Sequence, residues 1–174
     1  AANFPFPYKL TADEMQKRVF GQAHGVDIHE VTLRSAAGAE AKVLTWGATV
    51  RDLLIPTSSG QQRVVVGYDT LDDYVADTAH AGTIAGRFAN RIRHGRFALD
   101  EKVHHLPLNQ DGKHTLHGGG DGQGFSRRPW TLDDHDASSV TMSLQSAHGD
   151  AGFPGNLKVR CVYRLREPAT LHVE

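Results

Sequence analysis

Short segments in which polar and apolar residues alternate make up most of the chain, and glycines or prolines separate them. Alternation with a period of two is typical of strands that have one buried and one exposed face. In Ser138 to Gln145 every second residue is apolar, and Leu157 to Leu165 follow the same rule. The pattern predicts an all-β protein, with further strands at Ile28 to Ser35, Glu40 to Trp46, Val50 to Ile55, Arg63 to Tyr68, Phe97 to Leu99 and Val103 to Leu106.

Helical signals are few. Thr11 and Glu14 have the spacing of a capping box, which predicts a short helix over Ala12 to Val19. Leu71 to Ala76 are expected to form a second helical turn. Cys161 falls in the buried phase of its strand, so we expect a core residue and not a nucleophile.

The organisation along the chain predicts one domain that spans residues 1–174, because no repeat or low-complexity linker divides it. Pro168 and Ala169 interrupt the last long strand, and Thr170 to Glu174 resume the alternation. A strand at this place is expected to need partners that the sequence does not contain. On this interpretation the sequence is part of a longer chain.

Composition narrows the classes of function. The 19 basic and 20 acidic residues leave a net charge of −1, and no run of like charges interrupts the chain, so a nucleic-acid or membrane-surface role has no electrostatic support. No apolar run approaches the roughly 20 residues of a membrane helix. The single cysteine excludes an internal disulfide framework. Compartment and oligomeric state stay open.

Two polar segments framed by glycine are the candidate ligand loops, residues 86–92 and residues 116–120. Arginine offers a fork of donors, asparagine both donates and accepts, and histidine does either at neutral pH. Together Asn90, Arg91 and His117 suit a ligand covered with hydroxyl groups, and the neighbouring glycines permit close backbone approach and positive φ. Spacing alone also allows Arg87 and Arg91 to be structural ion-pair residues, and His117 a hydrogen-bonded turn residue.

Neither a metal site nor a phosphate cradle is expected. His104 and His105 point to opposite faces of a strand, and the pair His114 and His117 has no cysteine pair or H-E-x-x-H helix beside it. The glycine-rich run from Gly118 to Gly124 lacks the Lys-Ser/Thr pair of a phosphate loop and is interpreted as a mobile loop.

Several motifs follow one another in the order and spacing of a known family. They are Leu44-Thr45-Trp46-Gly47-Ala48-Thr49-Val50, Val64-Val65-Val66-Gly67-Tyr68-Asp69 with Tyr74, Gly86-Arg87-Phe88-Ala89-Asn90-Arg91-Ile92, Leu116-His117-Gly118-Gly119 with Gly124-Phe125 and Trp130, and Gly152-Phe153-Pro154-Gly155-Asn156-Leu157. From about Trp46 to Leu165 the sequence resembles the aldose 1-epimerase (galactose mutarotase) family.

The resemblance implies a large antiparallel β-sandwich, the mutarotase-like supersandwich, here incomplete. It also implies interconversion of the α and β anomers of an aldose such as glucose or galactose, with no metal or organic cofactor. Carried over residue by residue, Asn90 and Arg91 would bind sugar hydroxyls, His117 would hold the sugar near its reacting centre, and Arg91 with His117 would favour charge developing on oxygen. Arg87 would support the loop.

The sequence departs from the family in two places. The general-acid histidine of an "NHxYFNL"-like motif and the general-base glutamate near the C-terminus have no counterpart here; His172 and Glu174 lack that context. A non-catalytic carbohydrate-binding module and a hexose-phosphate 1-epimerase therefore stay open as alternatives. The second departure is Asp100-Glu101 where the family has Asp-Gly, which predicts a hairpin loop that is longer or differently shaped.

Overall fold

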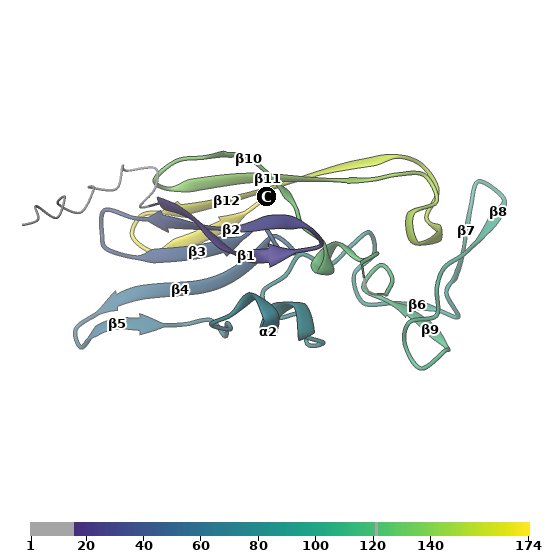
Figure 1. Cartoon of the computed structure of the whole chain (residues 1–174), viewed down its shortest axis with the longest axis horizontal. Helices are drawn as coiled ribbons and strands as arrows, with labels where there is room; N and C mark the ends of the chain where they lie inside the picture. Colours follow the sequence, from purple (N-terminus) through teal and green to yellow (C-terminus); the bar gives the residue numbers. More distant parts are fainter. Residues whose placement is uncertain (1–15, 121) are drawn as a thin grey trace, which may run out of the picture.

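A computed structural model of the protein describes residues 16–120 and 122–174, and in it two antiparallel sheets lie face to face (Figure 1). The first sheet has the order β1-β2-β3-β4-β5 and the second the order β10-β11-β12-β13, so each strand pairs with its neighbour along the chain. The bounds are β1 Lys17–Ala23, β2 Val26–Arg34, β3 Glu40–Leu44, β4 Thr49–Thr57, β5 Gly60–Arg63, β10 Thr131–His135, β11 Ser139–Ser146, β12 Leu157–Arg166 and β13 Thr170–Val173. The predicted antiparallel β-sandwich is confirmed.

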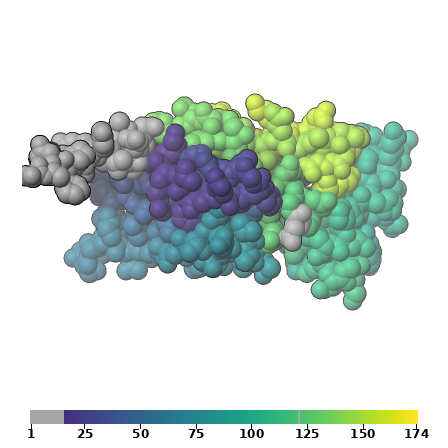
Figure 2. All heavy atoms as spheres, viewed as in Figure 1, coloured from purple at the N-terminus to yellow at the C-terminus, as the bar shows by residue number. Residues whose placement is uncertain are grey.

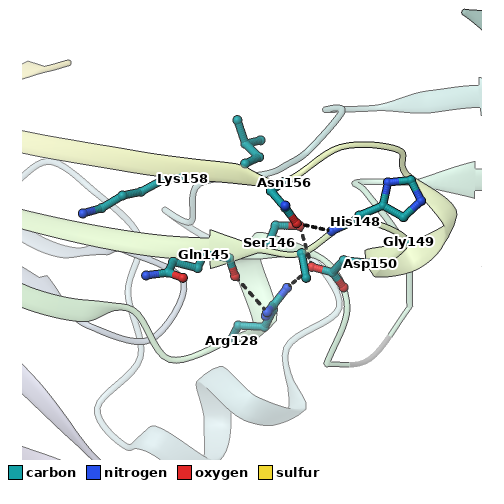
Figure 3. A pocket seen from close by; sticks show the side chains of 10 residues that line it. Arg128, Gln145, Ser146, His148, Gly149, Asp150, Asn156 and Lys158 are labelled. Carbon is teal, nitrogen blue, oxygen red and sulfur yellow. Dashed lines mark hydrogen bonds and ion pairs between the residues drawn. The ribbon is translucent and has the colours of Figure 1, made fainter.

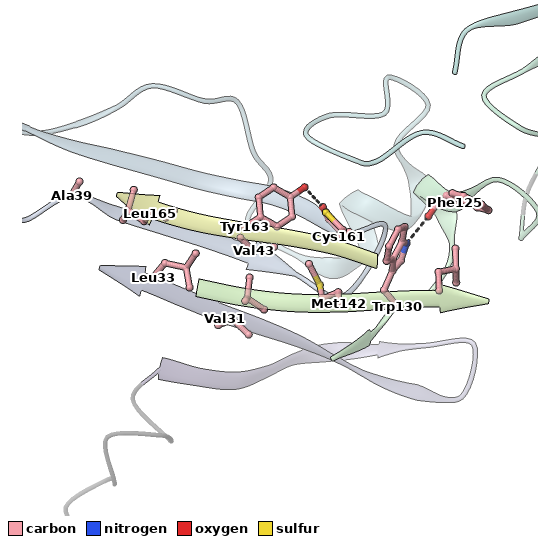
Figure 4. Close-up of a cluster of buried hydrophobic side chains, with 14 residues drawn as sticks. Val31, Leu33, Ala39, Val43, Phe125, Trp130, Met142, Cys161, Tyr163 and Leu165 are labelled. Carbon is pink, nitrogen blue, oxygen red and sulfur yellow. Dashed lines mark hydrogen bonds between the residues drawn. The ribbon is translucent and has the colours of Figure 1, made fainter. Parts of the chain in front are cut away.

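The main core lies between the two sheets (Figure 4). Val31 and Leu33 alternate along β2 and are at most 1% exposed, and they belong to one cluster with Met142 of β11 and Tyr163 of β12. The Tyr163 hydroxyl donates a hydrogen bond of 2.6 Å to the carbonyl of Ala48, beyond the end of β3. Apolar contact and a buried hydrogen bond thus join the second sheet to the first.

The first sheet buries its other face as well. The helix α2 (Leu71–Ala76) has the predicted bounds and contacts β1. Its Leu71 and Tyr74 pack with Ile28 and Leu44 of the sheet. The Thr70 hydroxyl accepts a hydrogen bond from the Asp73 backbone N–H, which satisfies one of the unpaired donors at the start of the helix.

Two small hairpin-like pairs form one end of the elongated molecule (Figures 1 and 2). One pairs β6 (Arg91–Arg93) with β9 (His114–Leu116), and the other pairs β7 (Arg96–Leu99) with β8 (Lys102–His105). The turn between β11 and β12 lies against this end, because its Phe153 packs with Leu106 and Phe97. The end is therefore tied to the sandwich by its own small core.

The strand predicted over Arg63 to Tyr68 is wrong. The strand β5 covers Gly60–Arg63, and after it the chain leaves the sheet edge. A Cβ at Gly67 would lie 2.0 Å from the carbonyl oxygen of Arg51, so the chain makes a close approach there. The Tyr68 N–H then bonds to the Tyr74 hydroxyl instead of a strand. The valine-rich run has strand propensity, but tertiary contacts redirect it.

The helix predicted over Ala12 to Val19 is wrong in its second half. Residues 12–15 lie outside the described residues, and Lys17 to Val19 begin β1, which pairs with β2 up to Val31. Ladder hydrogen bonds to β2 outweigh a capping-box signal of four residues. The last strand, predicted at Thr170 to Glu174, is present as β13, which pairs with β12 at the edge of the second sheet.

The hairpin between β7 and β8 also differs from expectation. Asp100 and Glu101 form a two-residue connection, with φ of 48° and 63°. The loop therefore keeps the short, left-handed geometry that suits Asp-Gly, and glutamate is forced into it. Cys161, by contrast, is 4% exposed in the sandwich core as predicted, and burial raises the pKa of its thiol.

Candidate functional site

The strands β6 and β9 bring the two candidate loops together. Arg91 faces Leu116 in their register, so the residue before β6 meets the residue after β9. The His117 N–H donates to the Asn90 carbonyl at 2.9 Å, and the Asn90 N–H donates to Nδ1 of the His117 ring at 3.1 Å. All three predicted residues, Asn90, Arg91 and His117, therefore lie in one corner of the molecule.

The Arg91 guanidinium is held from two sides. Its Nη1 donates to the Asn90 side-chain oxygen at 2.8 Å, and its Nε donates to the Gln110 side-chain oxygen at 2.6 Å. No carboxylate forms an ion pair with Arg91 within the described part of the chain, so the ion-pair alternative finds no support there. The group is oriented by neutral acceptors and keeps N–H donors on its Nη atoms for a ligand.

The contact with Asn90 determines the tautomer of His117. A backbone N–H can only donate, so Nδ1 must accept, and a neutral His117 ring carries its proton on Nε2. Burial lowers the pKa of His117, and the positive charge of Arg91 lowers it further. Near neutral pH the side chain is thus an uncharged donor with its Nε2–H free of Asn90.

The structure adds His80, which the sequence did not single out. Its ring centroid lies 4.5 Å from that of His117, and its Nδ1 lies 2.9 Å from the buried Ser126 hydroxyl. It borders a hollow of about 310 Å³ that Thr78, Asn109 and other residues line. His80 lies two residues before Gly82, and a polar residue near glycine is the pattern that identified the other two loops. Only the fold, however, places it against His117.

The backbone is under strain where these side chains meet. Asn90, His117 and His80 have φ of 62°, 50° and 57°, in the left-handed region. Asparagine and histidine adopt this region more often than most residues that have a Cβ, but it remains less favourable than the right-handed region. Strained residues of this kind gather at functional sites, where the surrounding structure holds them in place.

The glycines of the two loops serve to pack the loops against each other. A Cβ at Gly118 would lie 1.8 Å from the carbonyl oxygen of Gly86, and a Cβ at Gly86 would lie 2.3 Å from the Phe125 ring. Gly118 also has φ of 82°. The positive φ expected of these glycines is present at Gly118, and the missing Cβ there allows a close contact between the backbones of the two loops.

Arg87 is a structural residue, in agreement with the prediction. Its guanidinium donates to the Ser146 hydroxyl and to backbone carbonyls of the turn between β11 and β12, which belong to Ser146, Ala147, Pro154 and Gly155. The distances lie between 2.8 and 2.9 Å. Arg87 thereby fixes the loop that carries Asn90 and Arg91 to the sandwich.

A larger hollow of about 810 Å³ lies beside that turn, and its polar groups are used within the protein (Figure 3). Arg128 and Asp150 form an ion pair of 2.6 Å, and Ser146 donates to the same carboxylate oxygen. The Lys158 side chain points away from this pair in Figure 3. The groups do not converge on one ligand position, so we place the candidate site at His117.

The described residues contain neither a cluster of metal ligands nor a membrane-spanning helix. Across residues 16–120 and 122–174 no three His, Cys, Asp or Glu side chains gather as a metal site would require. Within the same residues no helix has the length and apolar character to cross a membrane. His172 and Glu174 contact each other at 3.3 Å, and Glu174 pairs with Arg164 of β12 in the second sheet.

Comparison with known proteins is consistent across sequence and structure. The sequence profile of the family described as "Aldose 1-epimerase" matches residues 29–174. The aldose 1-epimerase of Haemophilus influenzae is 32% identical over 160 residues, which are 92% of this chain and 46% of that protein. The galactose mutarotase of Rattus norvegicus is 35% identical over 152 residues, which are 86% of this chain and 43% of that protein.

Two solved structures share the fold. An aldose epimerase homologue from C. elegans superposes with a TM-score of 0.77 and 32% identity, covering 83% of this chain and 44% of that one. A galactose 1-epimerase from Lactobacillus acidophilus gives a TM-score of 0.78 and 28% identity, covering 90% and 46%. The chain spans about half the length of the curated relatives it matches.

Proposed function

The chain belongs to the aldose 1-epimerase family, and from this premise we propose that Asn90, Arg91 and His117 hold an aldose such as galactose or glucose while its α and β anomers interconvert. The observation that carries the proposal is the hydrogen-bonded corner in which the Asn90 N–H fixes the His117 ring and the Asn90 amide fixes Arg91. These groups present donors and acceptors to a small region, as a hydroxyl-rich ligand requires.

The reaction needs two proton transfers. A base removes the proton of the C1 hydroxyl, an acid protonates the ring oxygen, and the bond between C1 and the ring oxygen breaks to give the open-chain aldehyde. Rotation about the C1–C2 bond and closure on the other face of the carbonyl restore the ring with inverted C1. Positioned acid and base groups contribute roughly 10²- to 10⁴-fold each to such a reaction.

The neutral His117 suits the donor position at the sugar. Its Nε2–H can donate a hydrogen bond to a sugar oxygen near the reacting centre. The open-chain aldehyde is uncharged, so a positive charge on the histidine is not needed. The Arg91 guanidinium, which no carboxylate neutralises among the described residues, favours negative charge that develops on oxygen as the ring opens. In this role both residues touch the substrate.

Polarimetry tests the reaction. The rotation of freshly dissolved α-D-galactose or α-D-glucose is followed with the polypeptide that the complete gene encodes, because the chain spans about half of its relatives. We expect faster equilibration than in buffer, and about a hundredfold loss of that acceleration in His117→Ala. His105→Ala, at an exposed histidine of β8, is the matched control and should keep the rate. An unchanged rate in His117→Ala would overturn the assigned role.

Ligand titration separates holding from catalysis. Galactose is added to the ¹⁵N-labelled 174-residue chain, and the amide signals of Asn90, Arg91 and His117 are expected to shift together. Shifts confined to other parts of the chain would contradict the proposed site. Binding by the polypeptide from the complete gene without any acceleration of anomer exchange would instead favour the carbohydrate-binding module. Competition by galactose 6-phosphate in preference to galactose would favour the hexose-phosphate epimerase.

A further inference from the structure

His80 contacts His117 from a segment that the sugar-binding motifs do not include. The two rings have centroids 4.5 Å apart and planes inclined by 54°, which is a tilted aromatic contact. His80 belongs to the connection between α2 and the loop of Asn90 and lies on the edge of the 310 Å³ hollow. One imidazole thus packs on another at the proposed sugar site.

The position of His80 is firmly determined by its surroundings. Its Nδ1 is hydrogen-bonded to the Ser126 hydroxyl, and Ser126 is only 2% exposed. The Asp77 carboxylate accepts hydrogen bonds from the N–H groups of Ala79 and Ala81, at 2.8 and 2.9 Å. The backbone is therefore tied on both sides of His80, and the ring itself is tied at its own nitrogen.

The short turn that carries Ser126 is held by close packing. It is the 3₁₀ turn η1 (Phe125–Arg127), and a Cβ on Gly47 would lie 2.4 Å from the Ser126 carbonyl oxygen. The Ser126 backbone thus lies against the connection between β3 and β4, and its hydroxyl is hydrogen-bonded to His80. A rigid support of this kind gives precise placement to the groups that it carries.

We propose that His80 is a positioning residue of the sugar site: its anchored ring packs on His117 and keeps the Nε2–H of His117 directed at the bound aldose. The proposal rests on the function proposed above. Asn90 holds the His117 ring at Nδ1 only, so a packed neighbour is needed to restrain rotation of the ring about that hydrogen bond. His80 supplies this neighbour.

The charges around the two rings agree with this role. The groups that act on His80 are Asp77, Arg127 and His117, and Arg91 acts on His117. Burial lowers the pKa of His80, a charge on His117 lowers it further, Asp77 opposes this and Arg127 adds to it. The lowered pKa of His80 keeps its ring uncharged near neutral pH, so it packs on His117 as a neutral ring.

Histidine tautomers and titration midpoints, read from ring ¹⁵N signals of the 174-residue chain, test the proposal. In the wild type we expect His117 in the Nε2–H form with a midpoint below 6.5. In His80→Ala the Nδ1–H form should appear and the midpoint should move up toward 6.5, whereas His80→Phe, which preserves the ring's bulk, should keep it low. His105→Ala should change neither signal.

An unchanged tautomer and midpoint in His80→Ala would overturn the proposal. If this variant does not fold, His80→Gln decides by the same two signals, because it retains a partner for Ser126 and removes the ring. Galactose titration of the same samples separates the two proposals. If the wild type binds no galactose, the function proposed above is refuted. We expect His80→Ala, or His80→Gln in its place, to bind galactose about fivefold more weakly than the wild type. Equal affinity would refute only the role of His80.

Discussion

At the scale of single residues, the protonation of His117 and His80 links the site to stability. Burial is the first cause that lowers the pKa of each ring below the ordinary 6.5. In the interval between the lowered pKa and 6.5 the unfolded chain binds more protons than the folded one, so stability rises with pH there. The stabilisation is complete above about 6.5 and is lost as pH falls through the folded pKa.

We therefore expect the free energy of unfolding to decrease as the pH is lowered below 6.5, and to decrease less in His117→Asn. Asparagine does not titrate, and its side-chain oxygen can accept from the Asn90 N–H in place of Nδ1. Urea denaturation at a series of pH values gives both curves, and titrating groups that do not interact with His117 cancel in their difference. Parallel curves between pH 6.5 and 4.5 would show that His117 is not the group responsible.

A second residue-scale prediction concerns Glu101. Its φ of 63° is unfavourable for a residue with a Cβ, and its side chain is exposed, so no packing is lost on removal. Glu101→Gly is expected to stabilise the protein by about 1 kcal/mol. In Ala98→Gly, within β7, glycine should instead cost about 0.5–1 kcal/mol. Thermal unfolding of both variants gives the two signs, and destabilisation by Glu101→Gly would refute the strain.

At the scale of elements, alternation located the strands whose two faces differ. The strand β2 alternates Val31 and Leu33 with polar residues, and β11 and β12 do the same, so their predicted bounds are close to the observed ones. The strands β1, β5, β6, β9 and β10 were not predicted. None of them has more than one buried residue, and neighbouring chain segments hold them in place, which a local pattern cannot show.

Arg87 is the link between two elements, and its removal should loosen both. Five hydrogen bonds tie its guanidinium to the turn between β11 and β12. We expect Arg87→Met to cost about 2–4 kcal/mol, because several partially buried acceptors lose their donor together. Arg93→Met, at an exposed arginine of β6, should cost less than about 0.5 kcal/mol.

Hydrogen exchange checks where the effect of Arg87→Met falls. The amides of residues 147–156 should exchange faster in this variant, beyond the change in global stability, and those of β2 should follow global stability alone. Equal acceleration across the chain would mean that Arg87 contributes only to the sandwich as a whole.

At the scale of the whole molecule, the sequence predicted the sandwich and named the three residues of the proposed site, but not the contacts that connect them. Asn90, Arg91 and His117 were identifiable because donors and acceptors stand beside glycine in two loops. His80 was missed because its role depends on Ser126 and His117, both far along the chain. Motifs of neighbouring residues reveal groups within a loop, and contacts between loops require the fold.

The shared core predicts that the two sheets unfold together. Leu33 of β2 is fully buried and belongs to the same cluster as Met142 and Tyr163 of the opposite sheet. Leu33→Ala should cost about 2–5 kcal/mol, a large part of the 5–15 kcal/mol of a typical domain. Leu157→Ala, at a leucine of β12 that is 39% exposed, should cost well below 1 kcal/mol.

Exchange rates extend this prediction across the molecule. Because the inner faces of β2 and β12 bury each other, the amides of β12 should lose as much protection in Leu33→Ala as those of β2 do. Loss of protection confined to the first sheet would mean that the second sheet is stable by itself. In that case the contact between sheets would not set the stability of the scaffold, and the loops of Asn90 and His117 would depend on one sheet only.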